Sequence, residues 1–246
     1  MLADVATVFW RDWLILRRRF VKFIISRMIA PLLYLFAFGW GLGKDIAPQT
    51  GGTYLDFLVP GILALNSMNL SFSAIIPVHA ERVYHKSLEE YLMAPISLAS
   101  FIIGKIASAV TRSVISSAII IVLAYLAGAN LRLGALFAVT LVLNSIIFAE
   151  LGFWAAMKVD SYEEMGQVNT YILLPMSFLC GTFFSLQTLP PWLGGLLNLL
   201  PLTHTSGLLR SLALNDTFEP LSVLILLIYA GACFCLALNA LRKLAD

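Results

Sequence analysis

The chain has 246 residues, of which 60% are hydrophobic and 12% are charged, and its formal net charge is +2. A soluble domain carries roughly a quarter charged residues, so this composition excludes an ordinary water-soluble protein and indicates one that lies largely in a lipid bilayer. The net charge is too small to imply nucleic acid as a partner.

The first 22 residues have the pattern of an amphipathic helix, because apolar side chains recur every three or four positions. The segment 1–22 is therefore predicted to lie along the inner membrane surface, with Trp10 and Trp13 at the depth of the lipid headgroups. The apolar series consists of Leu2, Val5, Phe9, Trp13, Leu16 and Phe20.

Six apolar stretches follow, each long enough to cross a bilayer at about 20 residues per crossing. They are predicted to be helices, because backbone in lipid must satisfy its hydrogen bonds within the segment. We therefore predict an all-α, polytopic membrane protein in which residues 1–246 form one transmembrane domain. The predicted spans are 23–43, 54–78, 99–127, 134–157, 167–186 and 218–241.

Lysine and arginine are concentrated before the first span, between the second and third spans, and after the sixth span. Positive residues favour the cytoplasmic side of a membrane. This bias predicts that both termini and the linker between the second and third spans lie in the cytoplasm, and an even number of spans agrees with that orientation.

That linker contains a compact charged insert, HAERVYHKSLEE, at residues 79–90. It is predicted to form a short amphipathic helix over 80–94, which would fit a groove on a cytoplasmic protein. The alternative is a helix that lies against the chain's own surface. The residues expected to contact a partner are Glu81, Arg82, Tyr84, Lys86, Glu89 and Glu90.

Two predicted spans carry polar side chains, and the fifth also has Pro175 as a predicted kink. In the second span Asn66, Asn69 and Ser73 share one helical face. Such residues either mediate packing between helices or line a passage for an amphipathic substrate. The corresponding residues of the fifth span are Asn169, Thr170 and Ser177.

Two ionisable residues lie within the third and fourth spans, Arg112 and Glu150. These spans form an antiparallel pair whose turn centres near Leu131, which places both residues at equal depth. An ion pair is predicted, either as a structural salt bridge or as part of a proton relay.

The segment 187–215 is too apolar for a solvated loop, and Pro190-Pro191, Gly194-Gly195 and Pro201 break it into pieces too short to cross a bilayer. It is predicted to form a re-entrant or interfacial helical hairpin on the outer side. A peripheral flap without a role in transport is the alternative.

No pattern in the sequence indicates catalysis. The histidines are not grouped at metal-ligand spacing, and Gly43-Lys44 and Gly104-Lys105 lack the other residues of a phosphate-binding loop. We therefore expect no catalytic residue, no metal site and no cofactor in this chain. Energy for transport would come from an ion gradient or from a partner.

The chain resembles the ABC-2 type permeases, the membrane halves of certain ATP-binding-cassette exporters. The resemblance covers the amphipathic N-terminus, the six-span layout and the insert at 79–95. It is sharpest in PMSFLCGTFFSLQTLPPWLGGLLNLLPLTHTSGLLR at 175–210 and in YLDFLVPGILALNSM at 54–68. Within the family the chain is most similar to the drug-resistance and nodulation-type permeases, such as those that export lipo-oligosaccharides.

The resemblance implies a homodimer in a bacterial inner membrane, bound to two copies of a separate ATPase that holds ATP and Mg. Helix 80–94 would couple the permease to the ATPase, and charge reversal at Arg82 or Glu89 would uncouple ATP hydrolysis from transport. The second and fifth spans would line the passage. The hairpin, with Trp192, His204 and Arg210, would close its outer end.

The substrate implied by the resemblance is a lipid, a glycolipid or polysaccharide, or a hydrophobic drug. A competing hypothesis is an ion-coupled secondary transporter or channel that uses Arg112 and Glu150 and needs no ATPase. A third is a membrane scaffold without cargo, against which the polar faces inside the spans are the only argument.

Overall fold

A computed structural model describes residues 1–37, 54–183, 190–214 and 217–245, and every regular element in these ranges is helical. The all-α prediction is confirmed. The elements are α1 (Leu2–Arg18), α2 (Phe20–Tyr34), α3 (Tyr54–Val83), α4 (Ser87–Met93), α5 (Leu98–Leu126), α6 (Ala135–Lys158), α7 (Tyr162–Val168), the π-helix η2 (Asn169–Leu173), α8 (Leu174–Leu179), α9 (Pro191–Leu197), α10 (Pro201–Leu214) and α11 (Pro220–Ala245).

Five helices in the described ranges are long and apolar enough to cross a membrane: Phe20–Ala37, Tyr54–Val83, Leu98–Leu126, Ala135–Lys158 and Pro220–Leu244. They correspond to the first, second, third, fourth and sixth predicted spans. Residues 38–43 of the first predicted span lie outside the described residues. The chain is therefore a polytopic membrane protein, as its composition predicts.

The fifth predicted span, 167–186, is not one continuous α-helix. Its described part runs through α7, η2 and α8, and residues 184–186 lie outside the described residues. Pro175 has no N–H to donate, and its ring would clash with the carbonyl four residues earlier, at Tyr171. The wider turns of η2 directly before Pro175 remove that clash. The count of six spans stays a prediction.

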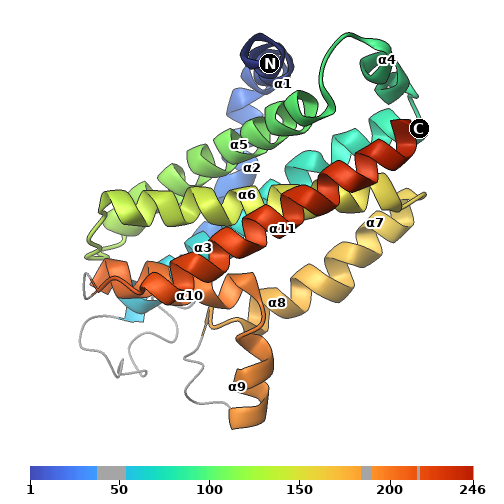
Figure 1. Ribbon diagram of the computed structural model, residues 1–246. Helices are drawn as coiled ribbons and strands as arrows, with labels where there is room; N and C mark the ends of the chain where they lie inside the picture. The colour runs from blue at the N-terminus through green and yellow to red at the C-terminus, as the bar shows by residue number, and fades with distance from the viewer. Residues whose placement is uncertain (38–53, 184–189, 215–216, 246) are drawn as a thin grey trace.

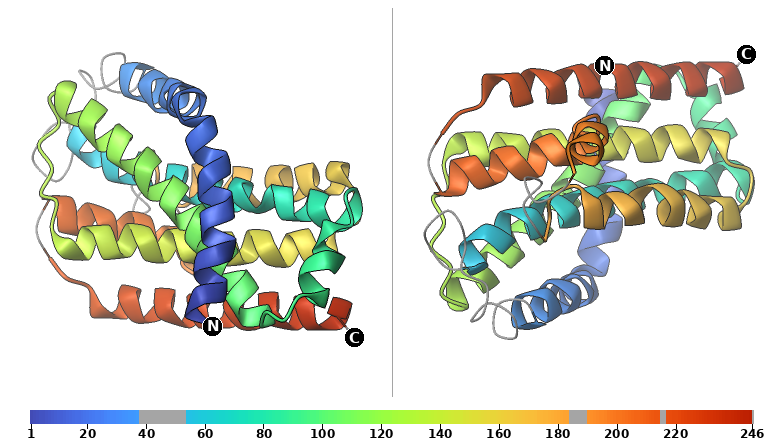
Figure 2. Two further views of the ribbon diagram at one scale, coloured as in Figure 1. Left: turned by 90° about the horizontal axis from the view of Figure 1, so that it is seen from above. Right: turned by 90° about the horizontal axis from the view of Figure 1, so that it is seen from below.

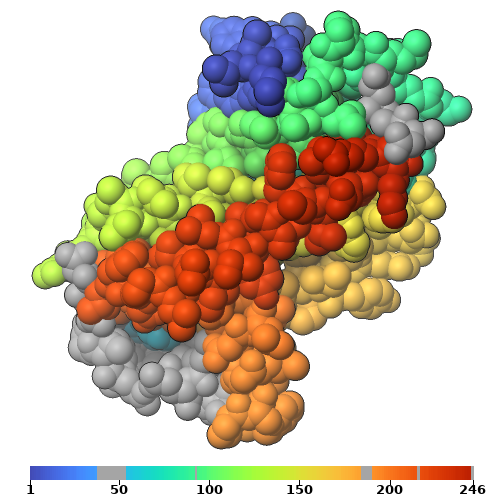
Figure 3. Space-filling view, in the orientation of Figure 1, coloured from blue at the N-terminus to red at the C-terminus, as the bar shows by residue number. Residues whose placement is uncertain are grey.

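Helices α3 and α6 form the centre of the bundle, and most of the span in each is buried. Helix α11 packs on α6 and covers one side of the molecule (Figures 1 and 3). The outer side of α11 exposes Leu221, Leu224 and Ile228. This exposed apolar surface is what a lipid-facing helix requires.

The two ends of the molecule differ. The N-terminus, α4 and the C-terminus lie in the upper half of Figure 1, whereas α9 lies at the bottom. The turns after α3 and α6, at residues 84–86 and 159–161, belong to the same end as α4. We call this the charged end, because it carries the ion pairs described below.

Two glycines let neighbouring segments approach closely. A Cβ atom at Gly61 would lie 2.4 Å from the carbonyl oxygen of Thr182, and one at Gly152 would lie 3.0 Å from that of Phe72. Both contacts are with backbone, which cannot rotate away. Gly61 therefore holds α3 against the chain segment that follows α8, and Gly152 holds α6 against α3.

Replacing Gly61 by alanine is expected to destabilise the protein by about 1–3 kcal/mol, because the added methyl group overpacks a backbone contact. Gly231→Ala in α11 is the matched control, since nothing lies within 4 Å of a Cβ atom there. Thermal unfolding of the purified proteins in detergent measures both. Equal melting temperatures for the two variants would contradict the close contact at Gly61.

Candidate functional site

Helix α1 crosses α5 at a steep angle (Figure 2). The crossing is centred on Gly104, where a Cβ atom would lie 2.7 Å from that of Val8. Val8, Asp12 and Leu16 are the buried residues of α1. The predicted amphipathic helix therefore exists, but it ends at Arg18 instead of residue 22, and its buried face packs on this protein's own α5.

A buried ion network fastens this crossing. The Lys105 Nζ atom lies 3.3 Å from Asp12 Oδ1 and 3.2 Å from Glu81 Oε2. Arg11 donates a second hydrogen bond to Glu81. Lys105 is only 3% exposed, so it requires these carboxylates to compensate for the water it has lost. The network joins α1, α3 and α5 at the charged end.

Arg82, the residue after Glu81, also fastens the end of α3 to a neighbouring helix. It donates hydrogen bonds to the carbonyl oxygens of Met157 and Val159, and its Nη2 atom lies 2.9 Å from Asp160 Oδ1. Carbonyls at the C-terminal end of a helix have no partner within the helix. Arg82 therefore caps α6 and ties its end to the end of α3.

These contacts correct the expectation that Glu81 and Arg82 face a partner protein. Both side chains are engaged within the chain, because α3 continues through Val83 and keeps them inside the bundle. The predicted helix over 80–94 is divided in two. Lys86 adopts a left-handed backbone conformation, with φ of 52°, and α4 begins after it.

The short helix α4 is attached to the bundle on one side only. Leu88 is 4% exposed, and the guanidinium of Arg11 lies 5.1 Å from the centre of the Tyr91 ring. The other side is open to solvent. We give the name docking face to a set of exposed residues in α4 and the turn before it, namely Tyr84, Lys86, Glu89, Glu90 and Met93.

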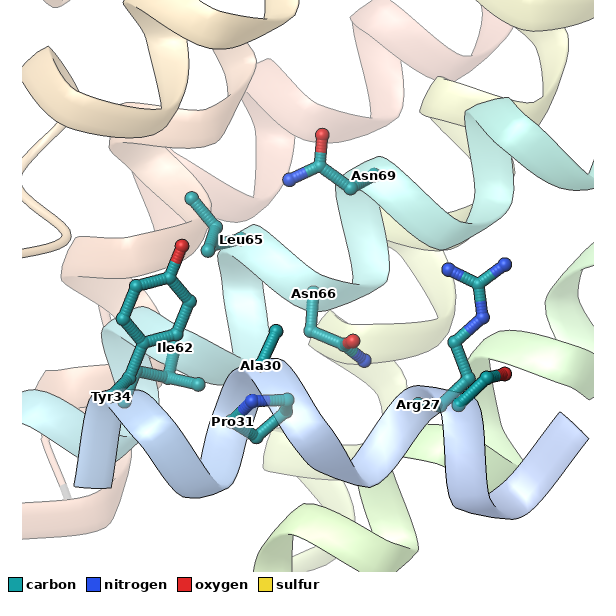
Figure 4. A pocket seen from close by; sticks show the side chains of 9 residues that line it. Arg27, Ala30, Pro31, Tyr34, Ile62, Leu65, Asn66 and Asn69 are labelled. Carbon is teal, nitrogen blue, oxygen red and sulfur yellow. The ribbon is translucent and has the colours of Figure 1, made fainter. Parts of the chain in front are cut away.

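Asn66, Asn69 and Ser73 lie on the least buried face of α3. The side-chain amide of Asn66 donates a hydrogen bond of 3.1 Å to Ser116 Oγ on α5, so this residue also contributes to helix packing. Asn66 and Asn69 border a cavity of about 150 Å³ between α2 and α3 (Figure 4). The cavity is lined by Ser26, Arg27, Ala30, Pro31, Tyr34, Ile62, Leu65, Asn66 and Asn69.

The polar residues of the fifth predicted span do not form one surface. Asn169 and Thr170 are exposed on η2, whereas Ser177 is buried and donates to the carbonyl oxygen of Leu173 at 2.7 Å. Thr170 likewise donates to the carbonyl oxygen of Gly166, at 3.1 Å. In the ranges that the structure describes, no hydrogen bond joins these residues to the polar face of α3.

The expected pair of Arg112 and Glu150 is absent from the ion pairs of the described residues. The two residues have different electrostatic neighbours. Arg112 interacts electrostatically with Arg27 and Asp12, which belong to α2 and α1. Glu150 interacts electrostatically with Cys233 on α11. Equal depth along two helices does not set the rotation of each helix about its axis, and the prediction failed on that point.

The described part of the predicted hairpin, 190–214, contains α9 and α10, and residues 187–189 and 215 lie outside the described residues. Trp192 is 73% exposed on α9. His204 Nε2 lies 2.8 Å from the carbonyl oxygen of Asn198, and Arg210 donates to the carbonyl oxygens of Phe57 and Gly181. Of the three predicted gate residues, Trp192 is thus the one free to contact another molecule.

One polar residue at the centre of the bundle was not identified from the sequence. Asn144 is fully buried on α6, where its amide donates to Ser67 Oγ at 2.7 Å and its oxygen accepts from Thr205 Oγ1 at 2.9 Å. It joins α6, α3 and α10. An asparagine within an apolar span is the signal that could have revealed it, as could Lys105 near the start of the third span for the ion network.

A family comparison and a search of known proteins both match most of the chain to membrane transport proteins. The model of a family described as ABC-2 type transporter matches residues 3–214. The chain is 26% identical over 223 residues to the inner membrane transport permease YadH of Escherichia coli K12, which covers 86% of this chain and 87% of that protein. It is 28% identical over 240 residues to nodulation protein J of Rhizobium meliloti, which covers 96% of this chain and 92% of that protein.

Proposed function

Because this chain belongs to the ABC-2 type transporter family, whose members are membrane permease subunits of ABC exporters, we propose that it carries substrate across the inner membrane while a separate ATPase supplies the energy. ATP and Mg would bind to that ATPase. This chain would contribute no catalytic group. Its substrate would be lipid-like, a glycolipid or polysaccharide, or a hydrophobic drug.

The observation that carries the proposal is the docking face of α4. A helix held by Leu88 and Tyr91 on one side, with Glu89, Glu90 and Met93 exposed on the other, can transmit a displacement to the bundle. Arg11 contacts both Tyr91 and Glu81, so movement of α4 would reach α1 and α3 directly. We propose that two copies of the ATPase bind this face in a dimer of the permease.

The proposed orientation places the charged end and both termini in the cytoplasm, where an ATPase has access to α4. The proposed passage runs along the polar face of α3, at Asn66, Asn69 and Ser73, with Asn169 and Thr170 as further candidates. Trp192 would act at the outer end. A second copy of the chain would complete the passage.

The test purifies the chain from its native membrane, identifies an ABC ATPase that comes with it, and reconstitutes the chain in liposomes with and without that ATPase. We expect such an ATPase to co-purify with the chain, and its rate of ATP hydrolysis to rise several-fold, because a permease dimer that binds two ATPase copies would shift them toward their active, paired state. Liposomes with the chain alone are expected to keep an imposed proton gradient, measured with a pH-sensitive dye.

The ion-coupled alternative makes the opposite prediction. A channel or secondary transporter that uses Arg112 and Glu150 would collapse or exploit the gradient without an ATPase, and Glu150→Gln would abolish that activity. Such a result, combined with no effect of the chain on ATP hydrolysis, would overturn the proposed function.

A further inference from the structure

The cavity between α2 and α3 is too small to hold a whole drug-sized substrate. Its volume is about 150 Å³, whereas pockets for drug-sized ligands measure roughly 300–1,000 Å³. It has room for a polar headgroup and leaves any apolar remainder of the ligand outside. The polar atoms at its wall belong to Ser26, Arg27, Tyr34, Asn66 and Asn69.

Positive charge is concentrated beside this cavity. Arg27 extends from α2 into the space next to α3 (Figure 4). Arg112 does not line the cavity, but it lies on α5, which packs against α2, and its charge acts on Arg27. The Arg112 Nε atom is buried without a hydrogen-bond partner. Within the described residues, neither arginine belongs to an ion pair.

The acidic residue whose charge acts on Arg112, Asp12, is already paired with another cation. Asp12 attracts Arg112 through space, but its carboxylate is bonded to Lys105 at 3.3 Å. Adjacent cations inside a membrane protein are costly when no anion faces them. A ligand with negative charge would remove that cost, and a guanidinium fits phosphate oxygens in a two-point geometry.

The surroundings of α2 indicate where such a ligand comes from. Helix α2 is the least buried of the long helices, with 11% of its span buried, and it exposes Ile25, Ile29 and Leu33. The cavity thus lies at the boundary between protein and lipid. Acyl chains would pack on this apolar surface while a headgroup occupies the cavity.

We propose that the α2–α3 cavity binds the phosphate of an anionic lipid that enters from the bilayer, with Arg27 and Arg112 as its counter-charges. The proposal rests on the proposed function, because it narrows the permease's substrates to amphiphiles with a phosphate-bearing headgroup. Asn69 would donate a further hydrogen bond to the same headgroup.

The test uses the full chain, without an ATPase, in phosphatidylcholine nanodiscs that contain a small fraction of spin-labelled phosphatidylglycerol. The wild-type chain is expected to immobilise labelled phosphatidylglycerol in preference to labelled phosphatidylcholine. Arg27→Gln and Arg112→Gln should each reduce that preference about fivefold, since one arginine near the headgroups is worth about 1 kcal/mol.

Arg18→Gln is the matched control, because Arg18 is exposed on α1 and lies outside the cavity. An equal loss in this control, no loss in Arg27→Gln, or no preference in the wild type would overturn the proposal. Arg27 is exposed, so its substitution tests the site even if Arg112→Gln fails to fold.

The lipid measurement is independent of the ATPase. If the chain binds no ATPase yet selects phosphatidylglycerol through Arg27, the proposed function fails and the lipid site stands. If the chain stimulates its ATPase while Arg27→Gln leaves lipid selection unchanged, the lipid site fails and the proposed function stands.

Discussion

Replacing Lys105 by methionine is expected to destabilise the protein by about 3 kcal/mol and to release α1 from the bundle. The substitution leaves Asp12 and Glu81 facing each other with one cation fewer, and both carboxylates are almost buried. For a chain of this size the loss corresponds to a fall in melting temperature of about 10 °C. Thermal unfolding in detergent measures the stability, and limited proteolysis at Arg17–Arg19 reports on α1.

Lys243→Met, at the exposed end of α11, is the control for removal of a lysine. Adding Asp12→Asn to the Lys105→Met protein should restore part of the lost stability, because the second substitution removes a charge that the first left unpaired. If Lys105→Met behaves like Lys243→Met, the ion network does not hold α1 to the bundle.

Reversing two charges on the docking face, Glu89→Lys with Glu90→Lys, is expected to weaken ATPase binding about tenfold or more while leaving the melting temperature unchanged. Both side chains are exposed on α4, and within the described residues neither belongs to an ion pair. Co-purification and ATPase stimulation measure the binding.

Arg82→Glu is the informative contrast, because the sequence alone assigns Arg82 and Glu89 the same role. Arg82 caps the end of α6 and pairs with Asp160. Its reversal is expected to lower the melting temperature, since it breaks those bonds and places a carboxylate next to carbonyl oxygens. If Arg82→Glu keeps full stability and Glu89→Lys with Glu90→Lys loses it, the assignment of the docking face is wrong.

Much of the fold was predictable because apolar length is a strong signal in membrane proteins. The spans that became α3, α5, α6 and α11 each begin and end within a few residues of their predicted bounds. Pro175 also predicted where the helix after α6 departs from regular α-helix. Only its consequence, the π-helix η2, required the structure.

The candidate site was less predictable, because function depends on which side of a helix each residue occupies. Glu81 and Arg82 look like partner-binding charges in a polar insert, but α3 continues far enough to bury them against α1 and α6. Arg112 and Glu150 were expected at one depth, but the charge near Arg112 belongs to α1, whereas Glu150 acts on Cys233 of α11. The cavity beside Arg27 exists because α2 and α3 are separated at that point. The distance between two helices cannot be read from the sequence of either one.

The sequence by itself therefore determined the membrane class, the helical fold, the position of most spans and the family, because each of these follows from composition, periodicity or a continuous motif. Tertiary structure decided which charges are free and which are used inside the chain. The physical reason is that a helix of fixed length can pack at any rotation about its axis. Contacts such as Gly104 with Val8 and Lys105 with Asp12 select one rotation.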